Sequence, residues 1–452
     1  MKENGDRLTL TTKLGYALGD FGGSLAFQTV TLFVVFYFTD VFGLSAAAAG
    51  GVFAIAKLWN AVCDPTIGAL SDRVRTRFGQ KRPFLLVGAV PLGVAFFLLV
   101  AAPSVEWKFA YAVGTFLFFS TAYSFVGVPY GAITASITKD PAERSSLTAY
   151  RMGFAILAIL LVGGITKPIV GAFSSPQVGF RFVGVVYGTA AALLTWVTFF
   201  TTYEHETAPP EKTSAREMLG LLKGNAPFLL LSGAIILHLA AMTVVATLTN
   251  YYFKYNLHAE SFTPVAYVSL FVCAAVVLPL WLFIERRIGK KHAFNAGMVI
   301  FGGSLLLLYA LPHLSARQTI PIMLLAGVGM SSIYIFPWAM VPSTIDYSEW
   351  KMGVRSEGLL YGFFYFAFKA SAALGGLVAG LGLELFGYTA QSGGTMSLHP
   401  DTLHGIRLLL TVVPTVLIGL GIGLIHNYPI TQAMEEAMKA DLDNRKTSGS
   451  LT

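Results

Sequence analysis

Apolar segments of about twenty residues recur along the whole chain, and they limit its possible folds more than any other feature. Hydrophobic residues make up 55% of the 452 residues and charged residues only 12%, about half the charged share of an ordinary soluble domain. A helix of about 20 apolar residues crosses a hydrocarbon core of about 30 Å. Because about a dozen such segments are present, we predict an all-α membrane protein embedded in the lipid bilayer.

Twelve transmembrane helices are expected in this sequence. They lie near residues 14–40, 46–71, 84–103, 108–136, 147–173, 179–202, 226–253, 263–284, 293–312, 319–343, 357–386 and 405–427. Most lysines and arginines outside them fall in the N-terminal tail, in the loops from even-numbered to odd-numbered spans, and in the C-terminal tail. Cytoplasmic loops carry such an excess, so both termini are predicted to be cytoplasmic. The net charge of +7 then follows from orientation, and no nucleic-acid partner is expected.

Short motifs of the first half return in the second half at a nearly constant distance. At offsets of 215, 210 and 208 residues, the pairs are FYFTD (36–40) and YYFKY (251–255), RFGQKR (77–82) and RIGKK (287–291), and VPYGAITAS (128–136) and FPWAMVPST (336–344). The predicted organisation is a six-helix bundle at 1–202, a cytoplasmic linker at 203–225, a second bundle at 226–427 and a cytoplasmic tail at 428–452. Duplicated transporters of this kind bind substrate between their halves near the bilayer midplane.

One face of the second expected helix carries Lys57, Asn60 and Asp64, at positions i, i+3 and i+7. A charge at the bilayer centre costs at least about 2.5–3.5 kcal/mol, so such residues are normally paired, face a cavity or act in transport. Pro65 lacks a backbone N–H and can leave a nearby carbonyl oxygen without its helical partner. The pattern indicates an oxygen-rich site for a small cation or a proton. A buried salt bridge between Lys57 and Asp64 is the structural alternative.

Asp20, Arg151 and Lys369 are further charges inside expected spans. Asp20 lies among glycines (15, 19, 22 and 23), which let the first helix pack closely against a neighbour or a cavity. Arg151 and Lys369 come from the two different halves, and they could pair with Asp64 and Asp20 or hold an anionic or hydroxylated substrate. Structural ion pairs and snorkelling to the interface are the alternatives, and snorkelling is preferred for Lys167 and Arg407 near span ends.

Aromatic and hydroxyl side chains on spans rich in small residues are candidates for a sugar pocket, because sugar rings stack on aromatic rings and form hydrogen bonds around their rim. The candidates are Tyr123, Ser124, Tyr130, Trp338 and Tyr365. In a chain with 35 Phe, 19 Tyr and 6 Trp, most aromatic residues must instead face lipid or the interface. His238, alone in an apolar helix, is expected to be structural.

The segment DYSEWKMGVRSEG (346–358) is expected to be a cytoplasmic loop that contacts Arg144 or the basic loop at 73–82 when the cytoplasmic side is closed. The residues assigned to such gate salt bridges are Asp72, Arg73, Arg77, Arg144, Asp346, Glu349, Arg355 and Glu357. The sequence has neither a phosphate-binding GxxxxGK[ST] motif nor an HExxH helix. We therefore expect a transporter driven by an ion gradient rather than an enzyme, with no cofactor.

Several of these motifs in combination resemble the glycoside–pentoside–hexuronide:cation symporter family, a branch of the major facilitator superfamily typified by the melibiose carrier. They are KLGYALGDFGGSLAF, YFTDVFGLS, AKLWNAVCDPTIGALSDRVRTRFGQKRP, VPYGAITASITKDPAERSSLTAYR and STIDYSEWKMGVRSEG, together with Lys369. The resemblance covers nearly the whole chain. It implies twelve helices in two bundles, alternating access, and symport of a sugar with sodium, lithium or a proton.

The family pattern on the second helix is W-D-A-x-x-D-P, whereas this chain has Asn60 at the first aspartate and keeps the second as Asp64. The family's hydroxyl ligand on the fourth helix corresponds to Ser124. The loss of one negative ligand weakens a sodium site and favours H+, although the Asn60 amide oxygen leaves Na+ possible.

The resemblance also carries over to the sugar site. Arg151 and Lys369 are retained, but Ser24 and Gly127 stand where the melibiose carrier has acidic residues. Losing two carboxylates while keeping two cations shifts the cavity toward an anionic substrate, and Asp20 can replace one of the lost groups. We therefore predict a monomeric symporter of the bacterial inner membrane that imports a sugar, glycoside or sugar acid with a coupled cation. The alternative is a lysolipid carrier like those of vertebrates in the same superfamily.

Overall fold

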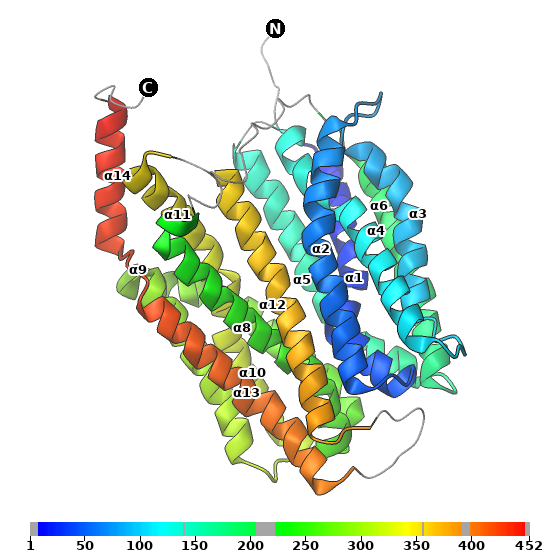
Figure 1. The fold of residues 1–452 in the computed structure, drawn as a ribbon. Coiled ribbons are helices and arrows are strands. Elements are labelled where there is room, and N and C mark those ends of the chain that lie inside the picture. Colours follow the sequence, from blue (N-terminus) through cyan, green and yellow to red (C-terminus); the bar gives the residue numbers. More distant parts are fainter. Residues whose placement is uncertain (1–7, 139–140, 205–221, 355–356, 390–397, 448–452) are drawn as a thin grey trace. The chain divides into compact units, whose positions relative to one another are not determined.

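The computed structural model describes residues 8–138, 141–204, 222–354, 357–389 and 398–447, and every named element in them is a helix (Figure 1). In the first half the helices are α1 (Leu10–Phe36), η1 (Tyr37–Val41), α2 (Ala46–Arg73), α3 (Arg82–Leu99), α4 (Lys108–Ile137), α5 (Pro141–Gly171) and α6 (Pro176–Thr201). In the second half they are α8 (Ala226–Tyr251), η2 (Tyr252–Asn256), η3 (Glu260–Phe262), α9 (Thr263–Ala310), α10 (Ala316–Met330), η4 (Ser331–Tyr334), α11 (Phe336–Met352), α12 (Glu357–Leu385), α13 (Pro400–His426) and α14 (Gln432–Thr447).

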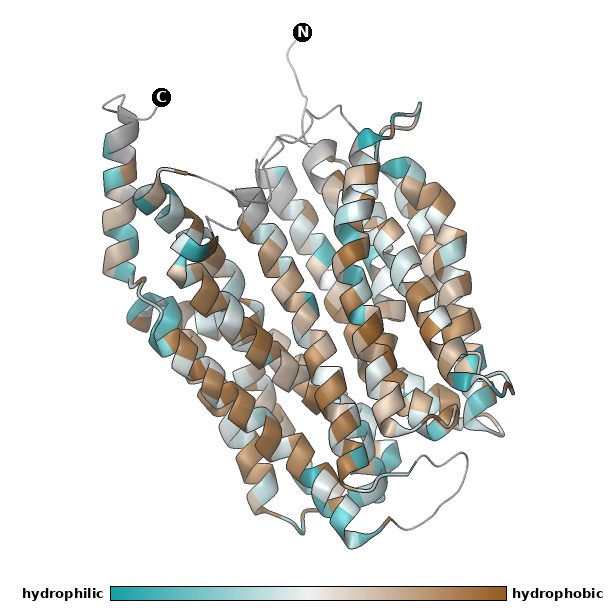
Figure 2. Cartoon of the chain, in the orientation of Figure 1, coloured by the Kyte–Doolittle hydropathy of each residue, from teal (hydrophilic) through white to brown (hydrophobic). Residues whose placement is uncertain are grey.

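Within the described ranges, 11 helical runs are long and apolar enough to cross a membrane. Hydrophobic residues cover the middle of these helices and hydrophilic residues gather toward their ends (Figure 2). Two of the expected spans, 263–284 and 293–312, both lie in α9, whose 48 residues include a non-helical Gly289. At about 1.5 Å per residue, a helix of that length is more than twice as long as a hydrocarbon core is thick. All the expected spans overlap helices, but two of them share one bent run.

Clustering of contacts divides the chain into two compact units. The first contains residues 1–210, 246–268 and 376–406, and the second contains 211–245, 269–375 and 407–452. The first unit therefore holds α1 to α6 together with one end each of α8, α9, α12 and α13. Most of the expected linker, residues 205–221, lies outside the described residues.

Small residues explain the position of α1, which packs against both α5 and α6 in the first unit. A side chain at Gly15 or Gly19 would overlap threonine side chains of α6. The Thr198 hydroxyl of α6 donates to the Gly15 carbonyl over 2.8 Å. The glycines of the first helix thus bring its backbone onto α6, as their spacing suggested.

The duplicated motifs adopt matching backbone conformations. The repeat FYFTD/YYFKY forms a π-helical turn in both copies, η1 and η2. Gly79 and Gly289, at equivalent places of RFGQKR and RIGKK, have φ of 101° and 78°, values that favour glycine. Matching conformations at matched positions support an internal duplication.

The structure corrects one expectation about secondary structure. Residues 346–352 were expected in a loop, but they form the end of α11, which stops at Gly353 with φ 70°. Tyr347, Ser348 and Glu349 are buried, so this segment packs as a helix. Alternating charges are also common on helices that have one solvated face, which is why the pattern was misleading.

Candidate cation and substrate site

A carboxylate, an amide and a hydroxyl meet where α2 and α4 pack together in the first unit. The Ser124 hydroxyl donates to Asp64 Oδ1 over 2.5 Å and lies 3.5 Å from Asn60 Oδ1. Asn60 and Ser124 are buried, and Asp64 is half-buried. The helix α2 continues through Pro65, which has no N–H for the carbonyl of Ala61 one turn earlier. The three side chains predicted for a cation site therefore do lie together, all with oxygen atoms that suit a proton or a hard cation.

Lys57 extends the same face of α2, and its side chain is held by aromatic rings. Its Nζ lies 4.6 Å from the centroid of Phe27 and 5.1 Å from that of Phe53. The residue is only 5% exposed. Cation–π contacts of this kind partly replace the hydration that a buried ammonium group loses. A fixed positive charge therefore stands one turn from Asn60.

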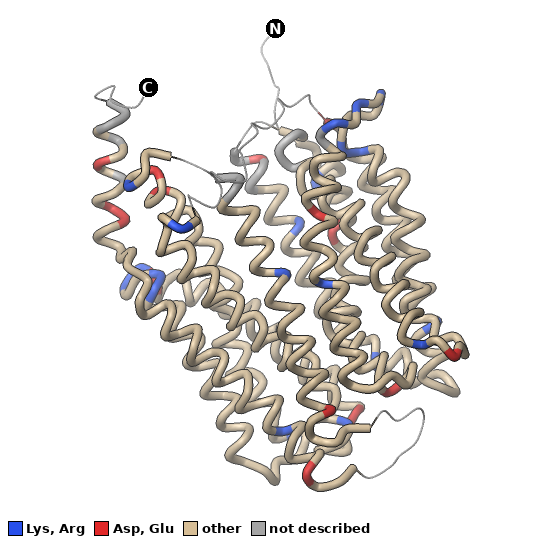
Figure 3. Tube along the Cα trace, in the orientation of Figure 1, with Lys and Arg blue, Asp and Glu red and all other residues tan. Residues whose placement is uncertain are grey.

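Asp20 of α1 and Arg151 of α5 form the second polar group of the first unit. Arg151 Nε lies 3.8 Å from Asp20 Oδ1, and both side chains keep partial exposure, 28% and 21%. Charged residues inside the helices are sparse (Figure 3), and Asp20 and Arg151 lie well inside α1 and α5. An arginine that is paired but still accessible can exchange its partner for the acid group of a ligand.

Tyr123 of α4 lies beside Gly23 of α1 and Gly127 of its own helix. A Cβ atom at Gly23 or at Gly127 would be 3.8 Å from its ring, in ordinary contact. Its ring stacks on Phe27 with centroids 5.2 Å apart. Ser24, at 8% exposure, is on the same turn of α1 as Gly23. Of the positions predicted for substrate, Gly127 therefore lies beside the Tyr123 ring.

The Tyr130 hydroxyl is engaged in helix packing. Its hydroxyl donates to the Tyr16 carbonyl over 2.7 Å, while the Tyr16 hydroxyl donates to the Tyr130 carbonyl over 3.2 Å. The two rings stack with centroids 4.6 Å apart. This reciprocal pair joins α1 to α4, and it leaves the Tyr130 hydroxyl committed to the fold.

The candidates of the second half lie in the second unit. Trp338 of α11 packs against Tyr365 of α12 with ring centroids 5.4 Å apart, and Tyr365 is 51% exposed. Lys369 follows one turn later on α12 and is half-buried. His238 is buried, with Nε2 3.2 Å from the Ile418 carbonyl and its ring against Phe294. This environment agrees with the structural role expected for His238.

The residues predicted for gate salt bridges are spread over both units. Arg73 and Arg77 are exposed, Asp346 is half-buried and Glu349 is buried. Arg355 and the side chains of Asp72, Arg144 and Glu357 lie outside the described residues. The predicted pairing of these residues therefore stays a prediction.

A further polar cluster, which sequence analysis missed, surrounds Asp40 at the end of η1. Asp40 is 5% exposed and accepts hydrogen bonds from Lys254 over 2.5 Å, from Tyr388 over 2.6 Å and from the Tyr255 hydroxyl. Thr39 donates to it as well, over 2.8 Å. Burial and then the Asp40 carboxylate raise the pKa of the Tyr388 hydroxyl above its usual range, so Tyr388 stays protonated as a donor. We call Asp40, Lys254, Tyr255 and Tyr388 the Asp40 cluster.

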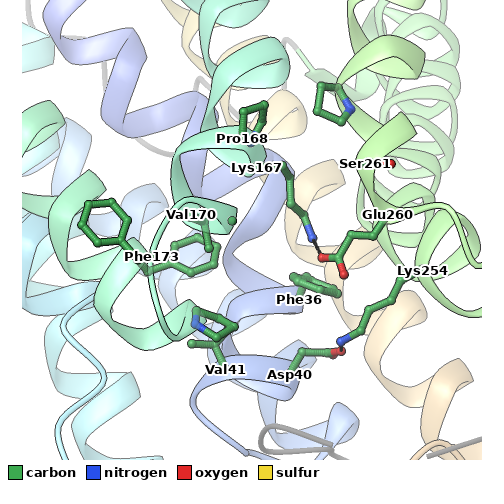
Figure 4. A pocket seen from close by; sticks show the side chains of 14 residues that line it. Phe36, Asp40, Val41, Lys167, Pro168, Val170, Phe173, Lys254, Glu260 and Ser261 are labelled. Carbon is green, nitrogen blue, oxygen red and sulfur yellow. Dashed lines mark hydrogen bonds and ion pairs between the residues drawn. The ribbon is translucent and has the colours of Figure 1, made fainter. Parts of the chain in front are cut away.

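A second ion pair lies beside the Asp40 cluster, with Phe36 between them (Figure 4). Lys167 of α5 donates to Glu260 of η3, and its Nζ lies 3.7 Å from the centroid of Phe36. The Lys167 side chain is 7% exposed, which corrects the expectation that it snorkels to an interface. Arg407 likewise donates to the Tyr309 carbonyl. The Asp40–Lys254 and Lys167–Glu260 ion pairs line a pocket of about 490 Å³ whose remaining walls are mostly apolar.

The chain resembles known proteins both in sequence and in fold. Residues 15–432 match the family described as MFS/sugar transport protein. The putative glycoside/cation symporter YagG of Escherichia coli is 33% identical over 447 residues, covering 96% of this chain and 95% of YagG. The glucuronide carrier protein homolog of the same species is 31% identical over 448 residues, covering 97% of each chain.

The fold has solved counterparts as well. A bacterial homolog of the human lysosomal transporter Spinster, in an inward-facing and unoccupied conformation, matches with a TM-score of 0.68 over 92% of this chain and 95% of that one. The sequences are 13% identical, so this likeness concerns the fold alone.

Proposed function

Because the chain belongs to the MFS/sugar transport protein family, we propose that it couples uptake of a sugar acid or glycoside to H+ through Asp64. It is a multi-pass membrane protein, and the related proteins are transporters and symporters rather than enzymes. The observation that carries the proposal is the hydrogen bond of 2.5 Å from Ser124 to Asp64, beside Asn60. A carboxylate inside a membrane helix costs free energy, so a carboxylate found there usually has a function.

The proposed coupling follows from the charge of Asp64. When Asp64 is ionised, reorientation of the carrier is opposed by the cost of moving a charged carboxylate through the apolar interior of the membrane. Protonation neutralises it, so the loaded carrier can reorient. Ser124 and Asn60 hold the carboxyl group in place for this exchange.

The proposal prefers a proton to sodium because of what surrounds Asp64. A hard metal cation takes several oxygen ligands, and Asn60, Ser124 and Asp64 supply three side chains with a single negative charge. Lys57, on the same face of α2 and buried among aromatic rings, adds a positive charge that opposes a second cation. A proton needs only the carboxylate.

The proposed substrate group binds near Arg151 and Tyr123. Arg151 is positioned by Asp20 at 3.8 Å and remains partly exposed, so a carboxylate can form a bidentate pair with its guanidinium group. The Tyr123 ring, flanked by Gly23 and Gly127, offers a flat surface for the apolar face of a sugar. The names of the related glucuronide carrier homolog and glycoside/cation symporter support this substrate class.

Alternating access requires that each end of the path can close. We take α9 as two crossings bent at Gly289, which gives twelve spans. We further propose cytoplasmic termini, from the excess of lysine and arginine in the tails and alternate loops, and a bacterial inner-membrane location. In that orientation the Asp40 cluster lies at the outer end, where it ties η1 to η2 and to the chain after α12. Together with Lys167 and Glu260 it forms the proposed outer closure.

The charges of this closure are arranged for reversible opening. Asp40 and Lys167 belong to the first half of the sequence, and Lys254 and Glu260 to the second. If the halves separate here, each keeps one carboxylate and one ammonium group. The four charges can then pair again within each half, so the open state leaves no uncompensated buried charge.

The proposal is tested by Asp64→Asn in proteoliposomes. We expect loss of gradient-driven accumulation, with substrate binding and exchange retained, since the amide keeps the hydrogen bond but cannot change charge. Asp401→Asn is a matched control, because that carboxylate is exposed and, among the described residues, is paired with His399. Normal accumulation by Asp64→Asn would show that another group couples transport.

A further inference from the structure

The bend of α9 and the start of α14 form a charged pocket of about 540 Å³ in the second unit. Lysines and arginines gather at this bend in Figure 3. Four cationic and three acidic side chains line the pocket: Arg286, Arg287, Lys290, Lys291, Glu285, Glu435 and Glu436. The proposed transport cycle uses none of them.

The two lysines of the pocket are committed to the protein itself. Lys290 donates to both carboxylate oxygens of Glu435, over 2.9 and 3.0 Å. Lys291 donates to the Tyr428 carbonyl over 2.9 Å. Glu436 accepts from Gln432 over 3.2 Å. The two lysine contacts join the bend of α9 to the start of α14 and to the segment just before it.

Arg286 and Arg287 are exposed, whereas the two lysines are half-buried. Arg287 lies over the Phe283 ring, with its guanidinium carbon 4.5 Å from the centroid. Within the described part of the chain neither arginine has a carboxylate partner. Two guanidinium groups are therefore available to an external anion, and Arg suits phosphate because its planar donors match phosphate oxygens.

The N-terminus of α14 adds backbone donors to the same pocket. Gln432 and Ala433, in its first turn, line the pocket. The Thr431 hydroxyl accepts from the Met434 N–H over 3.3 Å and the Thr431 carbonyl from the Glu435 N–H over 2.9 Å. The N–H groups of Gln432 and Ala433, earlier in the turn, have no helical carbonyl to bind. The N-terminal end of a helix of 16 residues also carries a partial positive charge that attracts anions.

Beside the arginines, α9 presents a wide apolar surface. Leu282 and Phe283 are 48% and 53% exposed, and Ile288 is 45% exposed. In a membrane-spanning helix such side chains face acyl chains. The arrangement thus places apolar surface next to an anion site, which is the chemistry of a phospholipid with an anionic head group and not that of a soluble phosphate.

We propose that this pocket binds the head group of an anionic phospholipid through Arg286, Arg287 and the first turn of α14, with the acyl chains along Leu282 and Phe283. The lipid anchors the bend of α9 to the membrane surface. In the equivalent loop of the first half, Lys81 donates to Ser71 and Arg82 to the Phe199 carbonyl, while Arg75 and Arg77 are exposed and provide a matched comparison.

The test is binding of a fluorescent phosphatidylglycerol to the purified full chain in neutral detergent. Each basic group near an anionic lipid contributes roughly fivefold to binding, so R286Q/R287Q should bind about thirtyfold more weakly than the unmodified protein. R75Q/R77Q, which removes two arginines from the equivalent loop, should bind within about twofold. Each single variant, R286Q or R287Q, should lose about fivefold, and these keep the proposal testable if the double variant unfolds.

Competing molecules distinguish the possible ligands. Unlabelled phosphatidylglycerol should displace the probe, whereas phosphatidylcholine and glycerol 3-phosphate should not. Equal binding by R286Q/R287Q and the unmodified protein would overturn the site. Displacement by glycerol 3-phosphate as effective as by the lipid would overturn the lipid and assign the pocket to a soluble phosphate.

Discussion

Asn60 lies one helical turn before Asp64 and is the residue on which the choice of coupling ion depends. Its Oδ1 lies 3.5 Å from the Ser124 hydroxyl that holds Asp64. We predict that Asn60→Asp makes uptake respond to sodium, because it adds the second negative ligand of the family pattern. Uptake measured at fixed pH over a range of sodium concentrations should rise in the variant and change little in the unmodified protein.

The control for this change is Asn60→Ala, which removes the amide without adding charge and should not create sodium stimulation. If Asn60→Asp responds to sodium no more than the unmodified protein does, the three oxygen-bearing side chains do not form the cation site.

A substitution of the single residue Arg151 tests whether the substrate carries an acid group. Arg151→Gln removes the guanidinium group that Asp20 positions, and we predict a loss of at least tenfold in affinity for a uronide, since hydrogen bonds to charged groups contribute about 1.5–3 kcal/mol. A neutral glycoside of the same size should lose much less. Equilibrium binding of the two ligands to the purified variant measures the difference, and equal losses would contradict recognition of an acid group.

At the scale of elements, the two π-helical turns η1 and η2 are joined through Asp40 and Lys254. We predict that Asp40→Asn and Lys254→Met each lower the free energy of unfolding by about 3–5 kcal/mol, because each leaves a partner charge, half-buried at Lys254 or buried at Asp40, uncompensated. The double variant should lose less than the sum of the two single losses. Thermal unfolding in detergent measures all three variants, and additive losses would show that the pair is not coupled.

Sequence patterns predicted the duplicated elements better than the contacts between them. The repeat FYFTD/YYFKY was recognised, and both copies adopt a π-helical turn. The ion pair between Asp40 and Lys254 was missed because a repeat shows which positions are equivalent and not which positions touch. Lys254 was given no role and Lys167 was expected to snorkel, because their partners are far away in the sequence.

The site on α2 was easier to predict because membrane helices restrict what a polar residue can do. The spacing of Asn60 and Asp64 places them on one helix face, and the resemblance to a known family linked them to Ser124. Tyr130 shows the limit of the same reasoning. Its hydroxyl bonds to the Tyr16 carbonyl, and no sequence pattern distinguishes a tyrosine that packs helices from one that contacts sugar.

At the scale of the whole molecule, hydropathy predicted the fold class. In lipid, the backbone N–H and C=O groups of a single apolar span find hydrogen-bond partners within the span when it is a helix. Spacing alone did not reveal that α9 runs through two expected spans, since its bend at Gly289 keeps helical structure on both sides. The two compact units also divide α8, α9, α12 and α13 along their lengths, which follows from contacts between distant segments.

The central claim, coupling of sugar uptake to protons through Asp64, is tested most directly in proteoliposomes with an imposed pH gradient. Sodium is held equal on both sides, the lumen is alkaline, and uptake of labelled methyl glucuronide is measured with and without a protonophore. We predict accumulation above equilibrium that falls as the external pH rises and is abolished by the protonophore. Accumulation that follows an imposed sodium gradient and ignores the pH gradient would contradict the account.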